Sequence, residues 1–460
     1  MNQALLRTLN QDLNGLAREV DGFLQKLTTD RPITLSFSKN PSVLILGGSF
    51  AGLETAQKIR RYARDLVDVT VIDRKSYLLF TPNILSEVLA DRDPAATLHM
   101  PINRALVRDG VHFLLGEVRE IDVERNRLRV ALEERPGQSD QTITYDYLII
   151  ALGSRLAYEA IVGFSAYGQT LTDTFHANRL RYFLHHQYRG GPIVIGSARF
   201  HQGTALDHWI PTASAACEGP LVETVFALGN WLTRRGANGN RITFFTPDTT
   251  FAKEIGAKAA AKLVEIAGQK GYRFLPNILD VAAVTADGVR FINGQQAEAE
   301  LAIVLPDWVP HTFLKGLPIS DDRGFVITDQ RMRNPRYPHV FAVGDAAAAT
   351  VPKLGYLAHL QSDVVAWQIA QDVGGIPAHH RAPLYQPLFD CLGIMGPRQG
   401  FFIRSNAWYG GQVETMKAGP VPYYLKALYK SMFFLMRGRL PNWSVIAANL
   451  VADRLSINML

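Results

Sequence analysis

The chain has only two cysteines among its 460 residues, Cys217 and Cys391. So few thiols exclude a disulfide scaffold and a zinc site built mainly from thiolates, although the two could still form a redox pair. No run of about 18 uninterrupted apolar residues occurs, which is the length that a membrane-crossing helix requires. The first twenty residues lack the basic, apolar and small-residue regions of a signal peptide. Any membrane attachment is therefore predicted to be peripheral or monotopic.

The sequence also lacks internal repeats and low-complexity segments. Its 47% hydrophobic and 20% charged residues are enough to build two or three domains with real cores. A net charge of +6 and a pI near 9.2 favour contact with anionic partners. Charge alone does not choose among nucleic acid, phosphate-bearing ligands and anionic lipid headgroups.

An apolar stripe runs along the first 30 residues, with steps that alternate between three and four positions. This pattern predicts an amphipathic helix with heptad spacing, followed by a linker up to residue 40. Two interpretations stay open, namely a helix that docks on its own domain and a helix that self-associates or binds a partner. The stripe consists of Leu6, Leu9, Leu13, Leu16, Val20, Phe23 and Leu27.

The pattern after residue 41 is typical of a parallel sheet covered by helices. A short apolar run at 43–46 is followed by glycines, a helical segment and a second apolar run at 69–72. A second series begins with an apolar strand at 193–196. We therefore predict an α/β fold with two Rossmann-like dinucleotide-binding domains and a C-terminal membrane-associating region. The predicted parts are 1–40, 41–160 with 325–380, 161–324, and 381–460.

The turn after the first strand has the features of a dinucleotide-binding site. Gly47 permits the tight turn, and Gly52 lets the helix pack closely on the strand. The helix N-terminus then offers N–H groups to a pyrophosphate, and Asp73 offers a carboxylate to ribose hydroxyls. Ser49 replaces the middle glycine. The predicted binding residues here are Gly47, Gly48, Ser49, Phe50, Ala51, Gly52 and Asp73.

Two further segments point to a flavin. The apolar run at 340–343 ends in Gly344-Asp345, and the run at 145–151 leads to Gly153. Together with the glycine turn, they resemble the flavoprotein reductases that have two dinucleotide-binding domains. This resemblance implies FAD, with Gly344-Asp345 beside its ribityl chain and with Ala151, Gly153 and Gly355 in the same site.

The second glycine turn, residues 196–203, departs from the pattern that a pyridine nucleotide needs. Ala198, Arg199 and Phe200 stand where spaced glycines are expected, and such side chains obstruct a pyrophosphate. NAD(P)H is therefore not expected to be the electron donor.

The cysteines and their flanks are similar to sulfide:quinone oxidoreductases, in particular the archaeal-like members. The similarity rests on the segments 214–220, 351–356 and 408–411 and extends over residues 41–430. It implies that hydrosulfide attacks a Cys217–Cys391 bridge and that the electrons pass through FAD to a membrane quinone. Which cysteine faces the flavin stays open.

The resemblance also suggests supporting residues. Lys353 is the candidate for stabilising reduced flavin, and Glu218 is a candidate base or proton carrier. His201 is a weaker candidate for the same proton role. No cysteine lies between Gly153 and Cys217, where some family members tether their flavin, so FAD is expected to be noncovalent. No metal site is predicted.

The C-terminal segment from Pro422 mixes aromatic and aliphatic residues with cations, as interfacial helices do. We expect it to attach the enzyme to a bilayer surface, on a face that the sequence does not identify, without any role in binding nucleic acid. A homo-oligomer is also expected. Two alternatives remain: a type II NADH:quinone dehydrogenase, and a non-catalytic assembly flavoprotein with inert cysteines. The cations of the proposed interface are Lys426, Lys430, Arg437 and Arg439.

Overall fold

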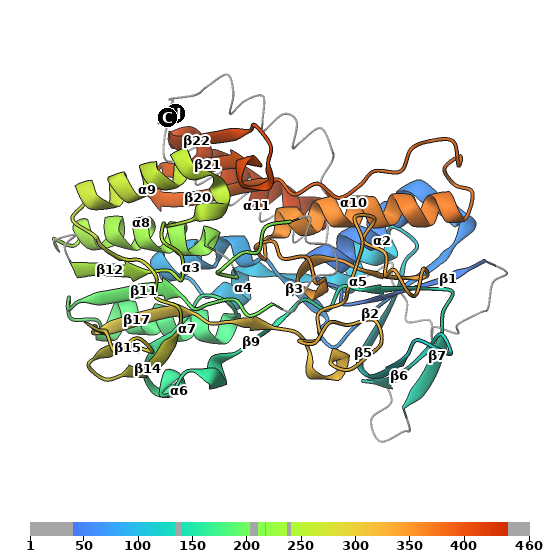
Figure 1. Cartoon of the computed structure of the whole chain (residues 1–460), viewed down its shortest axis with the longest axis horizontal. Helices are drawn as coiled ribbons and strands as arrows, with labels where there is room; N and C mark the ends of the chain where they lie inside the picture. Colours follow the sequence, from blue (N-terminus) through green and yellow to red (C-terminus); the bar gives the residue numbers. More distant parts are fainter. Residues whose placement is uncertain (1–39, 134–139, 203–209, 217, 237–240, 440–460) are drawn as a thin grey trace. The chain divides into compact units, whose positions relative to one another are not determined.

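The computed structural model describes residues 40–133, 140–202, 210–216, 218–236 and 241–439. The predicted N-terminal helix and Cys217 lie outside these residues. Within them the fold is α/β with two parallel sheets, which confirms the predicted fold class (Figure 1).

The first sheet has seven strands in the order β19-β8-β1-β2-β5-β6-β7. Its central strands are parallel and bury nearly every side chain, as their apolar sequences predict. Strands β6 and β7 extend it in antiparallel fashion. The bounds are β1 (Ser42–Leu46), β2 (Asp68–Asp73), β5 (His112–Asp122), β6 (Arg127–Leu132), β7 (Gln141–Thr144), β8 (Tyr147–Ile150) and β19 (Val340–Ala342).

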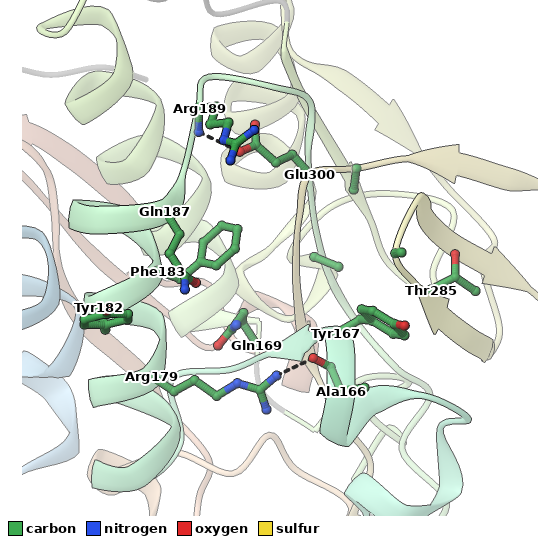
Figure 2. Close-up of a pocket in the computed structure, with 13 residues that line it drawn as sticks. Ala166, Tyr167, Gln169, Arg179, Tyr182, Phe183, Gln187, Arg189, Thr285 and Glu300 are labelled. Atoms are coloured by element: carbon green, nitrogen blue, oxygen red, sulfur yellow. Dashed lines mark hydrogen bonds between the residues drawn. The ribbon is translucent and has the colours of Figure 1, made fainter.

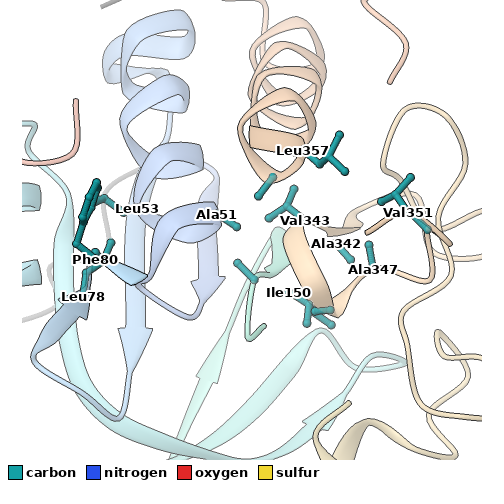
Figure 3. Close-up of a cluster of buried hydrophobic side chains, with 14 of the residues drawn as sticks. Ala51, Leu53, Leu78, Phe80, Ile150, Ala342, Val343, Ala347, Val351 and Leu357 are labelled. Atoms are coloured by element: carbon teal, nitrogen blue, oxygen red, sulfur yellow. The ribbon is translucent and has the colours of Figure 1, made fainter. Parts of the chain in front are cut away.

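Two helices lie side by side above this sheet, α2 (Phe50–Ala63) and α10 (Gly355–Asp372) (Figure 1). They come together through small buried side chains, and Thr55 Oγ1 donates to Ser362 Oγ across 2.9 Å. Figure 3 shows the same close packing at the strand ends, where Ala51 of α2 and Leu357 of α10 flank Val343. Small residues here let both helix N-termini approach the carboxyl ends of the strands.

The second sheet has five parallel strands in the order β10-β17-β11-β12-β13. The sequence led us to expect a helix directly after β11, but the first described helix after it is α8. A separate antiparallel sheet, β14-β15-β16, accompanies it. The bounds are β10 (Gly168–Gln169), β11 (Ile193–Ser197), α8 (Gly219–Thr233), β12 (Ile242–Phe245), α9 (Ala257–Gln269), β13 (Arg273–Leu275), β14 (Val281–Thr285), β15 (Gly288–Phe291), β16 (Gln296–Glu298) and β17 (Leu301–Leu305).

A three-stranded antiparallel sheet follows where the sequence showed little periodicity. It contains β20 (Phe389–Gly396), β21 (Gln399–Ser405) and β22 (Glu414–Gly419), and α11 (Pro420–Leu435) packs against it. Gly393 interrupts the expected alternation because the ring of Phe401 on the paired strand fills the space that a Cβ at Gly393 would need.

The remaining elements are short connections around the two parallel sheets. None of the described helices is long and apolar enough to cross a membrane. These elements are β3 (Tyr77–Leu79), α3 (Ile84–Leu89), α4 (Pro94–Leu98), β4 (His99–Pro101), α5 (Ile102–Val107), β9 (Arg155–Leu156), α6 (Phe164–Tyr167), α7 (Thr174–Tyr182) and β18 (Trp308–Val309).

Candidate functional site

The glycine turn after β1 has the close backbone contacts of a dinucleotide-binding turn. Gly47 has a φ of +100°, and a Cβ there would overlap the carbonyl oxygen of Ala151. A Cβ at Gly52 would in turn overlap the carbonyl oxygen of Gly47. Ser49 makes no side-chain capping bond, so it leaves the first-turn N–H groups of α2 for another acceptor.

Asp73 ends β2 beside this turn. Its Oδ2 accepts a hydrogen bond from Gly48 N at 2.7 Å, and its Oδ1 accepts one from Lys75 N at 2.9 Å. A carboxylate offers about four acceptor positions, so capacity for ribose hydroxyls remains. The carboxylate thus fixes the turn as well as facing the place where a ribose would bind.

The Gly344-Asp345 segment reaches the same end of the sheet through β19. Gly344 has a φ of +68°, donates its N–H to Gln361 Oε1 at 2.6 Å, and would bring a Cβ within 3.0 Å of Ala51 Cβ. A Cβ at Gly153 or Gly355 would meet no atom within 4 Å. The crowded glycines Gly47, Gly52 and Gly344 therefore shape the turn. Gly153 and Gly355 instead border open space, and this arrangement fits a bound dinucleotide.

The buried Lys353 and the half-buried Asp345 are two ionisable groups near the predicted flavin site. Burial raises the pKa of Asp345, and the charge of Lys353 lowers it in part. Burial lowers the pKa of Lys353 to about 8, opposed by Asp345. The ammonium lies 4.9 Å from the ring centroid of Phe325 and 5.1 Å from that of Phe200. A buried cation held mainly by aromatic rings is available to a ligand that gains negative charge.

The Lys353 backbone also links the flavin side to the cysteine side. Lys353 N donates to Ala216 O at 2.6 Å, and Ala213 N donates to Thr350 O at 2.9 Å. Cys217 follows Ala216 directly in sequence but lies outside the described residues. The segment that leads into Cys217 therefore runs beside the loop that carries Lys353.

Cys391 lies on β20 against the N-terminus of α8. A Cβ at Gly219, two residues after Cys217, would lie 3.5 Å from Cys391 Sγ. Burial and then the charge of Glu223 raise the pKa of this thiol to about 12, while Lys426 opposes them. A free Cys391 is therefore a thiol at neutral pH, although it lies at the positive end of a helix.

Glu218 is the N-cap residue of α8 and is 2% exposed. Thr246 donates its hydroxyl to Glu218 Oε1. Burial and the nearby charge of Glu254 raise the pKa of Glu218 well above its usual value. A raised pKa and a position next to Cys217 in sequence suit a proton carrier.

The second nucleotide-binding turn is occupied by side chains that bind one another. Arg199 Nη2 lies 3.3 Å from Asp280 Oδ2, and His201 Nδ1 lies 2.8 Å from Asp307 Oδ2. Arg199 Nε donates to the other ring nitrogen of His201 at 3.0 Å. This network lies beyond the carboxyl end of β11, where a pyridine nucleotide would approach. Its hydrogen bonds also give His201 a structural role that does not require proton transfer.

A cavity of about 730 Å³ lies elsewhere on the second sheet (Figure 2). Gln169 of β10, Arg179 of α7 and Glu300 before β17 line it. Glu300 directly precedes the amino end of β17, whereas ligands of such sheets bind at the carboxyl ends. The cavity is therefore separate from the predicted nucleotide site.

The predicted interfacial cations of the C-terminus contact protein groups, contrary to our expectation that they face lipid headgroups. Lys426 is 2% exposed and pairs with Glu223, and Lys430 pairs with Glu87 at 2.8 Å. Arg439 pairs with Asp109, and Arg437 donates to a backbone carbonyl at 3.1 Å. The expectation was wrong for the buried Lys426, because helical spacing does not reveal which face is buried, and headgroup attraction by the other three cations stays a prediction.

Three residues near the cysteines were missed by the sequence analysis. Glu223 and Lys426 form a buried ion pair beside Cys391, and Glu254 lies near Glu218. Glu223 is six positions after Cys217 in sequence, on the helix that follows it, which was a usable local signal. Nothing in the sequence linked Lys426 or Glu254 to the site, since distant segments bring them there.

The comparison with protein families agrees with this geometry. Residues 41–197 match the family described as pyridine nucleotide-disulphide oxidoreductase. The match, the fold and the glycine turn place the chain in the superfamily of FAD/NAD(P)-binding oxidoreductases, and its cofactor is FAD.

Among individual proteins, the chain is similar to the sulfide-quinone reductase of Aquifex aeolicus. The two are 26% identical over 413 residues, which cover 85% of this chain and 90% of the relative. The solved structure of the Aquifex enzyme superposes with a TM-score of 0.75 at 21% identity and covers 91% of this chain and 96% of its own. A type II NADH:quinone oxidoreductase of Staphylococcus haemolyticus is 24% identical and covers 72% of this chain and 83% of its own length. The relatives thus include both sulfide and NADH enzymes that use quinone.

Proposed function

We propose that this protein is a sulfide:quinone oxidoreductase that oxidises hydrosulfide to sulfur or polysulfide. The observation that carries the proposal is the position of Cys391 against Gly219, at the start of the helix that follows Cys217. Two cysteines far apart in sequence are thus associated with one helix N-terminus. Leu354, the neighbour of Lys353, lies at the same helix start, since a Cβ at Gly219 would be 3.5 Å from its Cδ2.

Hydrosulfide supplies the electrons in this proposal. It attacks one sulfur of a Cys217–Cys391 disulfide, so the old S–S bond breaks, a cysteine persulfide forms and the other cysteine leaves as thiolate. The N-terminus of α8 and the cation of Lys426 lower the cost of negative charge on that sulfur, against the burial that raises the pKa of Cys391. FAD, when bound, accepts two electrons from this site and passes them to quinone.

The binding residues have distinct proposed roles. Gly47 to Gly52 and Asp73 hold the dinucleotide, and Ala151, Gly153, Gly344, Asp345 and Gly355 border its flavin half. Lys353 supplies positive charge where electrons enter the cofactor. We keep noncovalent attachment of FAD as a prediction, together with the domain limits at 41–160 with 325–380, 161–324 and 381–460.

Occupation of the second nucleotide site supports sulfide over NADH. Arg199 and His201 are both engaged with carboxylates beyond the end of β11. A nucleotide would have to compete with these partly exposed paired charges for the same space. The type II NADH dehydrogenase alternative is therefore less well supported.

The C-terminal helix supports a quinone acceptor near the flavin. Phe433 of α11 lies 4.8 Å from Phe80 and 5.4 Å from Phe50, measured between ring centroids. Phe50 opens α2 beside the glycine turn. Phe80 and Phe433 are buried, so this cluster fixes α11 beside the glycine turn, and a lipophilic quinone would approach the flavin along α11.

Substitution of each cysteine tests the proposal. Cys217→Ser and Cys391→Ser are each expected to reduce sulfide-dependent quinone reduction at least about tenfold, with the bound flavin spectrum retained. The control is Ser320→Ala, which changes a buried hydroxyl on another loop. Retention of more than about a tenth of the activity by either cysteine variant would remove that cysteine from the relay.

A further inference from the structure

A buried acidic cluster lies beside the cysteine site, and the disulfide chemistry above gives it no role. Glu218 at the start of α8 and Glu254 on the 3₁₀ turn Lys253–Ile255 are each 2% exposed. Among the described residues, both carboxyl oxygens of Glu254 and Oε2 of Glu218 lack a hydrogen-bond partner of good geometry. The hydroxyl of Tyr409, close enough to Glu254 to sense its charge, is also without one. Several buried oxygens without partners in one place indicate a site for protons or water.

The charges around this pair favour retention of a proton. Glu218, Glu254 and Asp248 are near one another, and Lys253 is the cation that influences Glu254. Lys253 is already paired with Asp248 at 3.1 Å. Burial and then the charge of Asp248 raise the pKa of Glu254 to about 7. Two adjacent buried carboxylates cannot both be charged at low cost, so they titrate as a pair.

The pair connects, through neighbouring groups, the start of α8 beside Cys391 with a partly exposed lysine. Glu218 stands between Cys217 and Gly219, and Gly219 faces Cys391. On the other side, Asp248 contacts Lys253, whose side chain is 42% exposed. Glu218 is therefore linked by position to the cysteine site and by charge to Glu254, and Glu254 is linked by charge to the Asp248–Lys253 ion pair.

We propose that Glu218 and Glu254 share one proton and act as a relay that carries protons from the sulfur site to solvent. The inference rests on the proposed function. When hydrosulfide opens the disulfide, its proton remains on the new persulfide, and the electron pair of the broken bond remains on the thiolate. The persulfide then loses this proton, and the pair accepts it and passes it towards Asp248. Electrons leave separately, through FAD to quinone.

Glutamine variants test the relay because they keep the shape and remove the titration. Glu218→Gln and Glu254→Gln are compared with wild type and with Glu298→Gln, a variant of an exposed glutamate on β16. Flavin reduction by sulfide is followed anaerobically as a function of pH. Wild type and Glu298→Gln should show an inflection near pH 7 that Glu254→Gln lacks. The two relay variants should reduce their flavin about tenfold more slowly.

Infrared difference spectroscopy of the same proteins gives a readout that does not depend on activity. A band of a buried protonated carboxyl should disappear as pH rises through about 7 in wild type and be altered in both relay variants. Variants that keep the wild-type band and the wild-type pH profile would overturn the relay. If sulfide fails to reduce wild-type flavin at all, the proposed function fails and the relay fails with it. If sulfide reduces the wild-type flavin normally and Glu218→Gln and Glu254→Gln behave like wild type, the relay is rejected and the proposed function stands.

Discussion

Burial controls the charge of Glu254, and this gives a stability prediction. The folded pKa of about 7 exceeds the ordinary value of 4.5, so the folded state binds more protons between these two values. The contribution of Glu254 to the free energy of unfolding is therefore greatest below pH 4.5 and is lost as pH rises through about 7. Glu254→Gln should abolish this decline, a difference of no more than about 3 kcal/mol. Denaturant unfolding at about pH 5 and about pH 8 measures it, and an equal decline in both proteins would contradict the assignment.

The charges of the Glu223–Lys426 ion pair control the pKa, and hence the reactivity, of the nearby Cys391 thiol. Glu223→Gln removes a negative charge that raises the thiol pKa and leaves the Lys426 cation that lowers it. The pKa of Cys391 should therefore fall. Alkylation rates against pH, in a Cys217→Ser background, measure the change. Glu87→Gln breaks the other buried ion pair of α11, with Lys430, and serves as the control. An unshifted alkylation profile in Glu223→Gln would contradict this account.

The residues that sequence predicts well are those whose role is local. The glycines at 47 and 52 follow a strand and open a helix, and the structure shows the crowding that requires them. Glu254 is different, because its pKa depends on burial and on segments distant in sequence. Charge pairing of Lys426 with Glu223, 203 positions away, could not be predicted from spacing for the same reason.

At the scale of elements, buried apolar runs predicted β1, β2, β8, β11 and β19 to within a few residues, whereas β10, β13 and β17 of the second sheet were not predicted. Helix α9 begins at Ala257, after Gly256 with a φ of +101°. The antiparallel sheet β20 to β22 was missed, since its glycines break the two-residue alternation. Elements defined by continuous burial were thus easier to predict than those that depend on pairing with a specific neighbour.

Helix α11 retains an exposed apolar face although its cations turn inward. Tyr424, Leu428 and Leu435 are 48%, 53% and 72% exposed and recur at helical spacing. We expect this face to contact the bilayer. The double substitution Leu428→Ser and Leu435→Ser should weaken binding to phospholipid vesicles at least about tenfold, because each leucine contributes roughly 1.5 kcal/mol or more on burial.

Its control is Ile292→Ser, which changes a residue that is 67% exposed on the second domain. Vesicle flotation distinguishes the variants. Truncation from Pro422 is a poorer test than these substitutions, since it would also remove the buried side chains of Lys426 and Phe433. Unchanged flotation of the double variant would mean that α11 is not the attachment surface.

At the scale of the whole molecule, the heptad stripe at residues 1–30 lies outside the described residues, so its role is argued from sequence alone. A seven-residue repeat favours helix-to-helix packing, whereas lipid requires only a broad apolar face. Deletion of these residues should therefore lower the mass of the assembly in detergent, measured by light scattering, and leave vesicle binding intact. An unchanged assembly would assign the stripe to another part of the same chain.

The central claim is that electrons enter this flavoprotein from sulfide and that NADH is not a donor. The paired residues in the second nucleotide turn and the position of Cys391 at the start of α8 both support it. Anaerobic mixing of the purified protein with sulfide or with NADH, followed by flavin absorbance, tests it most directly. The account predicts that sulfide bleaches the flavin and NADH does not. Rapid bleaching by NADH, with no response to sulfide, would contradict it.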